Sequence, residues 1–454
     1  METKARPSPS WKRDISIFLA SQTLSLFGSM LVQYAIMWHI TLSTKSGIAM
    51  TLSIICGFLP TFLISPFGGV FADRYDRKRL IMLSDGMIAA VSAVLAAIYG
   101  LGGDALWLLL AAQAARSVGQ AIQQPAVGAI LPQLVPEAEL MRINGLTQTI
   151  MSVIMFVCPI VSGALLSVAS MSVIFLIDVV TAVPAIAILA FFLKPAAPAS
   201  ESPASADRAV SAATDAAPAA GLAAAERGYL EDMKLGLRYI RDHRYLVSLF
   251  LYLGILFFLV TPAAFLTPLQ TARTFGEDVW RLTAIEIVFS SGMMLGGAAL
   301  TLWKGFRNRV RTLLLANLVW ALCTFALGFV PWFWLYLVFM GFFGVGMPLF
   351  NAPMTTMIQE HVEAEYMGRV FGVMTMLNTS VMPISMLIFG PIADRVRIEW
   401  LLLGTGAVMV LLAFLTLANK RLMEAGEPVA APDAAPGTAG EPKSEAETAE
   451  AAKA

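Results

Sequence analysis

The sequence predicts an all-α membrane protein with twelve transmembrane helices, arranged as two six-helix halves. The first observation is composition: 57% of the 454 residues are hydrophobic and 14% are charged, whereas roughly 25% of the residues in a soluble globular chain are charged. The second observation is a series of long apolar runs, and the third is a polar segment that divides these runs into two equal sets. These features exclude an ordinary soluble domain.

The apolar runs have the length of helices that cross a bilayer. About 20 apolar residues span the ~30 Å of hydrocarbon, and twelve runs reach that length. We expect the first run to be a retained anchor, because it is too long for a signal peptide and lacks a small-residue cleavage site. The expected spans are 15–40, 47–72, 80–101, 106–132, 144–167, 172–193, 244–270, 282–303, 312–330, 332–358, 370–393 and 400–419.

Polar segments define the domain organisation. The segment between the halves is rich in Ala, Pro and Ser as far as residue 228 and cannot build a core. Residues 229–245 then alternate apolar and charged side chains at helical spacing, which suits a helix on the inner membrane surface. The expected parts are a cytoplasmic N-terminus 1–14, a first half 15–193, a cytoplasmic linker with an amphipathic helix 194–243, a second half 244–419 and a disordered cytoplasmic tail 420–454.

The Lys and Arg residues predict the orientation in the membrane. With the N-terminus inside, about 25 of the 31 lie on the inner side and about five on the outer side. We therefore expect a multi-pass protein of the cell membrane with both termini in the cytoplasm. The net charge of zero gives no support to nucleic-acid binding.

The two halves share sequence patterns at corresponding positions. Residues 123–146 (QQPAVGAILPQLVPEAELMRINGL) and 351–373 (NAPMTTMIQEHVEAEYMGRVFGV) both place a proline within a helix before an acidic turn, and Arg and Gly open the next helix. Residues 68–80 (GGVFADRYDRKRL) have a weaker counterpart at 296–313 (GGAALTLWKGFRNRVRTL). Two parallel six-helix repeats are typical of one large transporter fold.

The charged turn at 68–80 carries the clearest resemblance to a known family. The chain resembles the major facilitator superfamily over residues 11–420, and more narrowly its proton-coupled drug exporters, the branch with macrolide-efflux and siderophore-export proteins. Asp76 stands where the family's pattern for this turn has a glycine. The residues that match the pattern are Gly69, Asp73, Arg74, Arg77 and Lys78.

These residues suggest a gating latch. Asp73 lies at the inner end of its helix, where an acid can cap the N-terminus of another helix; in the family that partner is the helix that starts here near Gly368. Capping and charge–dipole interactions are each worth roughly 0.5–2 kcal/mol. A few such contacts suit a two-state gate. For Arg74 and Arg79, simple orientation by positive charge is an equally good interpretation.

Arg116 is a second marker, because the family places an arginine in this helix. A charge at this depth costs at least ~2.5–3.5 kcal/mol, so we expect Arg116 to face a cavity or a partner. The same helix carries Gln113 and Gln120. Residues 158–163 (CPIVSG) resemble the antiporter signature of the family, although close helix packing explains them nearly as well.

Intramembrane acids are the candidates for proton coupling. An acid that is neutral in lipid titrates when water reaches it, which allows it to carry a proton. Asp178 and Glu286 lie deep in their predicted spans, and structural hydrogen bonding is an equally good interpretation of both. Asp85 lies close to the inner end of its span, where we expect it to be near bulk water and to pair with Arg77 or Arg79. The resemblance adds Arg116 to the proton-coupling set.

Flexible apolar and amide side chains near the middle of the spans predict a polyspecific pocket. Core or lipid contact remains an alternative for each of these residues. The candidate substrate-binding residues are Gln33, Tyr34, Met37, Gln113, Gln120, Phe257, Phe258, Met340, Phe343 and Met347.

The expected function is secondary active export of amphipathic small molecules, such as drugs, macrolides or siderophores, by proton antiport. An importer or a lipid or lysolipid flippase of the same fold is the alternative. No Walker-type phosphate loop, HExxH motif or nucleophile elbow is present, so we expect neither an ATP-driven pump nor an enzyme. The three cysteines lie in apolar stretches without metal-ligand spacing, and we expect no metal and no cofactor. The expected partners of this monomer are its small-molecule substrate, protons and membrane lipids.

Overall fold

The computed structural model describes residues 11–192, 233–363 and 365–427, and within these ranges it leaves the side chains of residues 65–74, 137 and 421 undescribed. Helix is the regular secondary structure of the described ranges, which contain no strand. The helices are α1 (Trp11–Thr44), α2 (Gly47–Arg74), α3 (Arg77–Gly100), α4 (Leu106–Leu134), α5 (Glu137–Val168), α6 (Met171–Phe192), α9 (Arg244–Phe265), α10 (Thr267–Thr274), α11 (Val279–Trp303), α12 (Arg309–Leu327), α13 (Phe333–His361), α14 (Met367–Arg395), α15 (Ile398–Ala418) and α16 (Lys420–Ala425).

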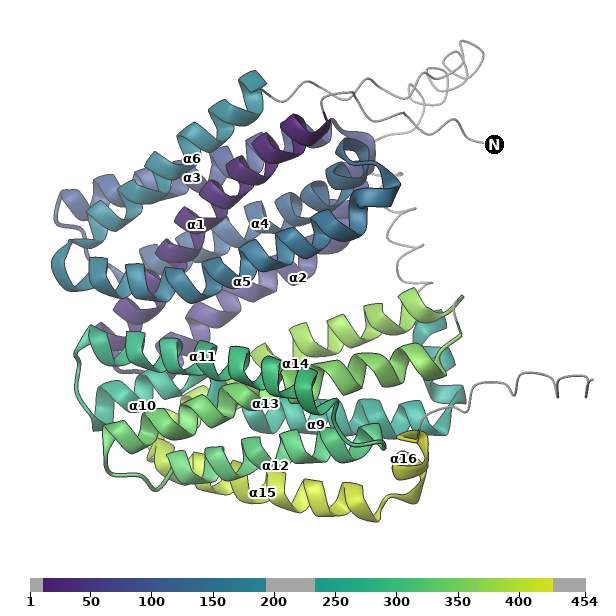
Figure 1. The fold of residues 1–454 in the computed structure, drawn as a ribbon. Helices are drawn as coiled ribbons and strands as arrows, with labels where there is room; N and C mark the ends of the chain where they lie inside the picture. The colour runs from purple at the N-terminus through teal and green to yellow at the C-terminus, as the bar shows by residue number, and fades with distance from the viewer. Residues whose placement is uncertain (1–10, 193–232, 364, 428–454) are drawn as a thin grey trace, which may run out of the picture.

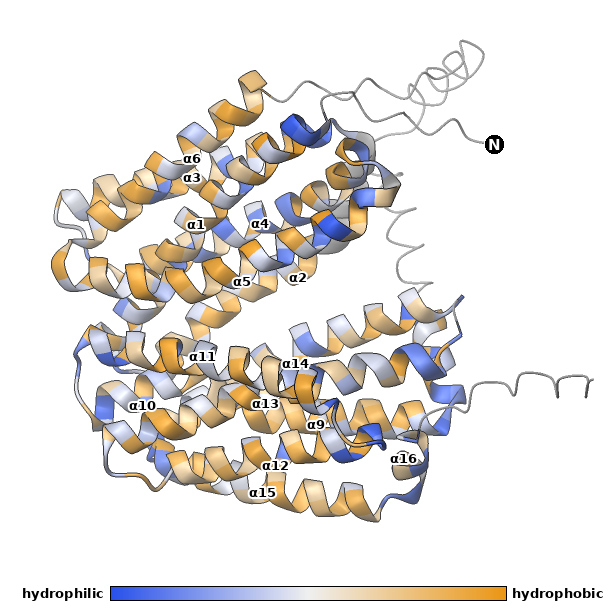
Figure 2. Cartoon of the chain, viewed as in Figure 1, coloured by the Kyte–Doolittle hydropathy of each residue, from blue (hydrophilic) through white to orange (hydrophobic). Residues whose placement is uncertain are grey.

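The predicted all-α membrane fold is confirmed. Eleven of the described helices or helical pairs are long and apolar enough to cross a membrane. The remaining predicted span is α4, which has the necessary length of 29 residues but carries Arg116 and several glutamines. Apolar residues run along the helices, and polar residues gather mainly at the helix ends and in the turns (Figure 2).

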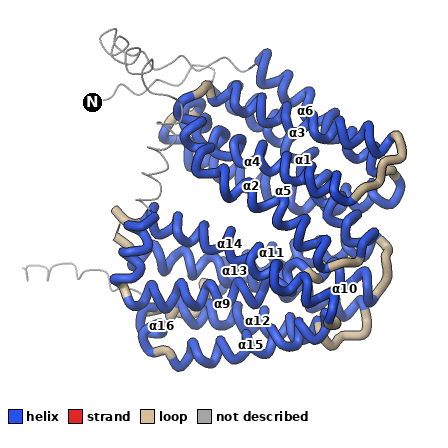
Figure 3. Tube along the Cα trace, turned by 180° about the vertical axis from the view of Figure 1, so that it is seen from behind, coloured by secondary structure: helices blue, strands red, loops and turns tan. Residues whose placement is uncertain are grey.

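The helices of each half form a bundle of their own (Figure 1). In the first half α2 packs against α4, α6 packs against α1 and α3, and α5 packs against α1. In the second half α13 packs against α11 and α12, while α9 packs against α14 and α15. The view from behind shows the same separation into two bundles (Figure 3).

The largest contacts between the halves are those of α2 with α14 and of α5 with α11, and α1 also contacts α10. The two bundles meet on the side where α10 lies and diverge toward the side where the N-terminus lies (Figures 1 and 3). We call the first side, with the α1–α2 and α14–α15 turns, the far end. We call the opposite side, with the starts of α1, α3 and α14, the termini end.

Glycines allow the halves to touch closely toward the far end. A Cβ atom on Gly47 of α2 would lie 2.2 Å from the carbonyl oxygen of Gly390 in α14. A Cβ atom on Gly163 of α5 would lie 1.9 Å from the Thr283 hydroxyl of α11. No side chain larger than hydrogen fits at these crossings, so backbone meets backbone at Gly47 and Gly390, and the Thr283 side chain packs directly on the α5 backbone at Gly163.

The two halves begin their third helices in the same way. Asp76 precedes α3 and its side chain accepts hydrogen bonds from the backbone amides of Lys78 (2.9 Å) and Arg79 (3.3 Å). Asn308 precedes α12 and accepts hydrogen bonds from the amides two and three residues later (3.0 and 3.4 Å). Both residues are preferred N-caps. The glycine-to-aspartate difference at position 76 therefore has a structural role as a helix cap.

Residues 233–242 of the predicted amphipathic segment are helical. Their buried face packs against the start of α14, where the Tyr239 and Tyr366 rings stack at 4.5 Å. Gly236 lies on the same face, and a Cβ atom there would lie 3.0 Å from the carbonyl oxygen of Arg369. This helix is thus attached to the second bundle, and residues 194–232 of the predicted linker lie outside the described residues.

Candidate functional site

A cavity of about 400 Å³ lies between the two halves. α1, α2, α4 and α5 contribute its walls on one side, and α9, α10 and α11 contribute them on the other. A cavity shared by two bundles is the arrangement in which a relative movement of the bundles changes access to a bound molecule. The lining residues are Met30, Gln33, Tyr34, Met37, Ser53, Ile54, Gly57, Phe58, Gln113, Met155, Ala264, Phe265, Pro268 and Glu286.

The cavity wall is mainly apolar with a few polar groups. Gln113 of α4 donates a hydrogen bond to the Ser53 hydroxyl of α2 (2.9 Å), which fixes the amide at the wall. The Tyr34 ring packs against Trp38 with 5.7 Å between ring centroids. An apolar wall with a small number of positioned polar groups is typical of small-molecule sites.

Glu286 is the acid of the described cavity lining. It lies about two turns into α11 and is half-buried. Among the described residues, no hydrogen bond or ion pair engages its carboxylate. Its side chain is thus open to a proton or to a bound molecule.

A second, much smaller pocket in the first half, here called the extension, shares part of its lining with this cavity. Gln33, Gly57 and Gln113 line both the cavity and the extension, and Arg116 and Gln120 line the extension. Gly57 leaves little room beyond itself, because a Cβ atom there would lie 3.3 Å from the Gln113 amide oxygen. The extension has a volume of about 10 Å³, which is at the lower limit for one water molecule.

Arg116 forms an ion pair with Asp178 behind this extension. Arg116 of α4 is 3% exposed and Asp178 of α6 is fully buried. One guanidinium nitrogen binds both the Asp178 carboxylate and the Ser92 hydroxyl, and the other donates to the Ser29 carbonyl oxygen (3.1 Å). The hydroxyls of Ser92 (2.6 Å) and Ser29 (3.2 Å) in turn donate to Asp178. Four helices, α1, α3, α4 and α6, thus satisfy this charge pair together.

The structure corrects the expectation for Asp85. Asp85 is 1% exposed and pairs with neither Arg77 nor Arg79. One carboxylate oxygen accepts hydrogen bonds from Ser25 (2.7 Å) and Gln123 (2.6 Å), and the other is buried without a partner. Asp85 lies about two turns into α3 and faces α1 and α4 inside the bundle. The two arginines lie in the first turn of α3, at its end, and therefore do not pair with it.

The predicted latch is only partly within the described residues. Arg77 donates to the carbonyl oxygen of Ala129 (2.8 Å), and Lys78 donates to that of Ala190 (3.0 Å). Both contacts lie within the first half. The side chains of Gly69, Asp73 and Arg74 lie outside the described residues.

The predicted substrate-binding residues separate into two groups. Gln33, Tyr34, Met37 and Gln113 line the cavity, and Gln120 lines its extension. The remaining five pack within the second bundle and do not line this cavity: Phe257, Phe258, Met340, Phe343 and Met347. The three phenylalanines contact other aromatic rings: Phe257 packs against Phe350, Phe258 against Phe389 and Phe343 against Trp320.

The sequence predicted no residue of the α2 wall, which is formed by Ser53, Ile54, Gly57 and Phe58. The spacing of Ser53 and Gly57, four residues apart, places two small residues on one helix face and was the available signal. Met155, Ala264 and Pro268 carried no such signal. In the described part of the chain, no group of three or more His, Cys, Asp or Glu side chains is placed to hold a metal ion.

Comparisons with known proteins agree with this architecture. The family model of the Major Facilitator Superfamily matches residues 15–386. Macrolide efflux protein A of Streptococcus pyogenes is 28% identical over 406 residues, covering 89% of this chain and 95% of that protein. Macrolide efflux protein A of Enterococcus faecalis is 29% identical over 344 residues, covering 75% of this chain and 100% of that protein. The crystal structure of a POT family transporter with a thioalcohol conjugated peptide shares the fold, with a TM-score of 0.64 at 12% identity over 91% of this chain and 98% of that chain.

Proposed function

This chain belongs to the major facilitator superfamily, and we propose that it exports amphipathic small molecules from the cell in exchange for protons. It is a multi-pass membrane transporter. In the proposed orientation both termini are cytoplasmic, the termini end of the bundles faces the cytoplasm, and the monomer works in the cell membrane. The skew of Lys and Arg toward that side supports this orientation.

The cavity between the halves carries the proposal. Its apolar wall, with methionines and aromatic rings, fits the apolar face of an amphipathic molecule, and the Gln33, Tyr34 and Gln113 side chains offer hydrogen bonds to the polar face. The likeness to two macrolide efflux proteins favours export of a drug-like molecule. Siderophore-like molecules share this amphipathic chemistry.

Glu286 is the proposed proton carrier at the cavity. A carboxylate without a protein partner binds a proton when the cavity opens to one side and releases it when the cavity opens to the other. Arg116 and Asp178 form the second part of the proposed coupling site, because Arg116 lines the extension, which shares Gln33, Gly57 and Gln113 with the cavity.

The test compares cells with and without the protein, each with and without a proton uncoupler. Accumulation of a fluorescent amphipathic drug, a macrolide and an iron-free siderophore is measured. We expect the protein to lower accumulation of at least one compound, and the uncoupler to abolish this difference. Higher accumulation in energised cells would instead identify an importer. No effect on these compounds, together with movement of labelled lysolipid between leaflets, would identify a flippase.

A further inference from the structure

Asp394, the next-to-last residue of α14, binds the first turn of α2 in the other half. Its carboxylate accepts hydrogen bonds from the backbone amides of Gly47 (2.6 Å) and Ile48 (2.9 Å) and from the Ser46 hydroxyl (2.8 Å). The first amides of a helix have no partner within the helix. A carboxylate at this position also interacts favourably with the helix dipole. An acid of the second half thus caps a helix of the first half.

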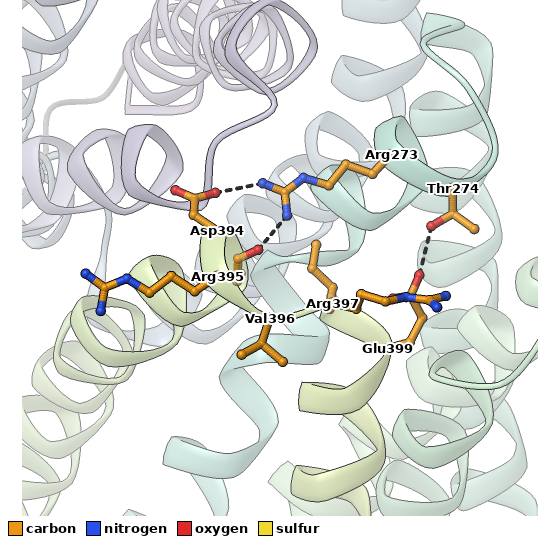
Figure 4. Close-up of a pocket in the computed structure, with 9 residues that line it drawn as sticks. Arg273, Thr274, Asp394, Arg395, Val396, Arg397 and Glu399 are labelled. Carbon is orange, nitrogen blue, oxygen red and sulfur yellow. Dashed lines mark hydrogen bonds and ion pairs between the residues drawn. The ribbon is translucent and has the colours of Figure 1, made fainter.

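Arg273, in the last turn of α10, holds Asp394 from the side of its own half. Its guanidinium group donates to the Asp394 carboxylate (2.7 Å) and to the carbonyl oxygens of Lys45 (2.6 Å) and Ala393 (2.5 Å). Figure 4 shows Arg273 and Asp394 pointing toward each other, whereas Arg395 points away. One guanidinium group therefore contacts both halves.

The contact continues one turn further along the same two helices. The Thr51 hydroxyl of α2 donates to the Met386 carbonyl oxygen of α14 (3.0 Å). A Cβ atom on Gly390 would lie 1.7 Å from this hydroxyl and 2.8 Å from the Gly47 carbonyl oxygen. The far end is closed in this structure by fitted backbones as well as by charge.

Water has access to the charged part of this contact. An open hollow of about 430 Å³ is bordered by Arg273, Asp394 and the turn between α14 and α15. The Arg273 and Asp394 side chains are 30% and 20% exposed. Hydrogen bonds in such a place exchange with water at modest cost. The contact between the halves is therefore suited to breaking and reforming.

The helices of this contact, α2 and α14, end in a similar sequence pattern. Residues 390–395 read Gly-Pro-Ile-Ala-Asp-Arg, and residues 69–74 read Gly-Val-Phe-Ala-Asp-Arg. The arginine of each pattern is the last residue of its helix, α14 in one case and α2 in the other. Asp394 therefore occupies in α14 the position that Asp73, the acid of the predicted latch, occupies in α2.

We propose that Asp394 and Arg273 form a latch that holds the far end of the two halves together and must open before the cavity opens toward that end. Opening separates Asp394 from the α2 amides, which water then binds. The acid keeps Arg273 as its partner, because both residues belong to the second half. The proposal rests on the movement of the halves in a transport cycle, whatever substrate or ion is carried.

The test measures the distance between the far ends of the two halves in full-length protein in nanodiscs. Spin labels are attached to cysteines at Leu101 and Phe329, which lie in far-end turns of opposite halves and are 90% and 81% exposed. Cys56 is replaced by alanine, whereas the buried Cys158 and Cys323 are retained. No substrate and no proton gradient are present, so the outcome is independent of the proposed export function.

We expect Asp394→Asn to raise the fraction of molecules with a long inter-label distance by about fivefold or more, because charged hydrogen bonds are roughly twice as strong as neutral ones. Arg273→Gln should act in the same direction. The control is Asp104→Asn, since this acid also lies at the far end but is 78% exposed and contacts the first half only. Distances in Asp394→Asn and Arg273→Gln that equal those in wild type would overturn the proposal, as would an equal shift in the control.

A steric variant covers the case in which a charge variant does not fold. Gly390→Ala places a methyl group against Thr51 and the Gly47 backbone only while the far end is closed. We expect the same shift toward long distances. The matched control is Gly404→Ala in α15, where a Cβ atom would contact nothing within 4 Å. Unchanged distances in Gly390→Ala would contradict the closure described here.

Discussion

Arg116 of α4 and Asp178 of α6 form an ion pair in the interior of the first half, where 4% and 0% of their side-chain surfaces are exposed. Two serine hydroxyls complete the hydrogen bonding of the carboxylate. This arrangement explains how α4 tolerates a charge among apolar helices, because burial of an ion is offset only by a partner and by full hydrogen bonding.

The first prediction concerns the stability that this pair provides. Asp178→Asn leaves the Arg116 charge buried without a counter-ion, and we expect a loss of about 3–5 kcal/mol in the free energy of unfolding. Asp85→Asn is the matched control, because Asp85 is equally buried in the same bundle but has hydroxyl and amide partners only. Thermal unfolding in nanodiscs measures both. Equal losses in the two variants would show that the charge pair has no special role.

The second prediction concerns the connection between the cavity and Arg116. Gly57→Val should fill the narrow extension, where even a Cβ atom would lie 3.3 Å from the Gln113 amide oxygen. Because Gly57 also borders the cavity, some loss of substrate binding is expected, but substrate-induced proton flux per bound substrate should fall at least tenfold. Proteoliposomes with a pH-sensitive dye measure the flux. Gly297→Val in α11, where a Cβ atom would meet no neighbour within 4 Å, is the control and should keep its flux.

The sequence predicted the helices and their order because each span has a length and an apolar composition of its own. It could not predict which apolar residues face the cavity. Tyr34 and Phe343 both looked suitable, yet Tyr34 lines the cavity and Phe343 packs beside Trp320 in the second bundle. The hydropathy of a membrane helix is high on all sides, so periodicity does not identify the inward face.

The contacts between the halves could not be predicted from the sequence either. The Ala-Asp-Arg run at 393–395 is visible in the chain, but its meaning depends on the start of α2 lying beside the end of α14. Arg116 is a contrasting case. A charge in an apolar helix costs free energy, so the sequence predicted that Arg116 faces a cavity or a partner. The position of α6 makes Asp178 that partner.

The third prediction separates the two acids of the turn between α2 and α3. Asp76→Ala removes the N-cap of α3, and we expect it to lower the free energy of unfolding by roughly 0.5–2 kcal/mol with little change in transport per folded molecule. Asp73→Asn tests the latch predicted for the termini end. We expect near-normal expression and at least a tenfold fall in transport. Transport by Asp73→Asn equal to wild type, at matched protein levels, would leave Asp73 with no gating role.

The last prediction concerns the proton carrier. Glu286 lines the cavity between the halves, and within the described residues no hydrogen bond or ion pair engages its carboxylate. Removing its charge should therefore cost little stability, unlike the loss of Asp178, whose partner is buried with it. Glu286→Gln keeps the shape of the side chain and resembles the protonated acid, which both donates and accepts hydrogen bonds, but it cannot release a proton at neutral pH.

We expect the Glu286→Gln carrier to bind substrate and to exchange it down a gradient, yet to accumulate none against a gradient and to move no protons. Substrate-induced proton flux and counterflow in proteoliposomes measure these two activities separately. Glu139→Gln at the start of α5 is the control, because its partner Arg142 lies on the same helix surface and neither residue borders the cavity. Wild-type proton flux from Glu286→Gln would exclude this residue as the carrier. Loss of flux in both Glu286→Gln and Asp178→Asn, with counterflow retained in both, would instead indicate that the proton passes between the cavity and the buried ion pair.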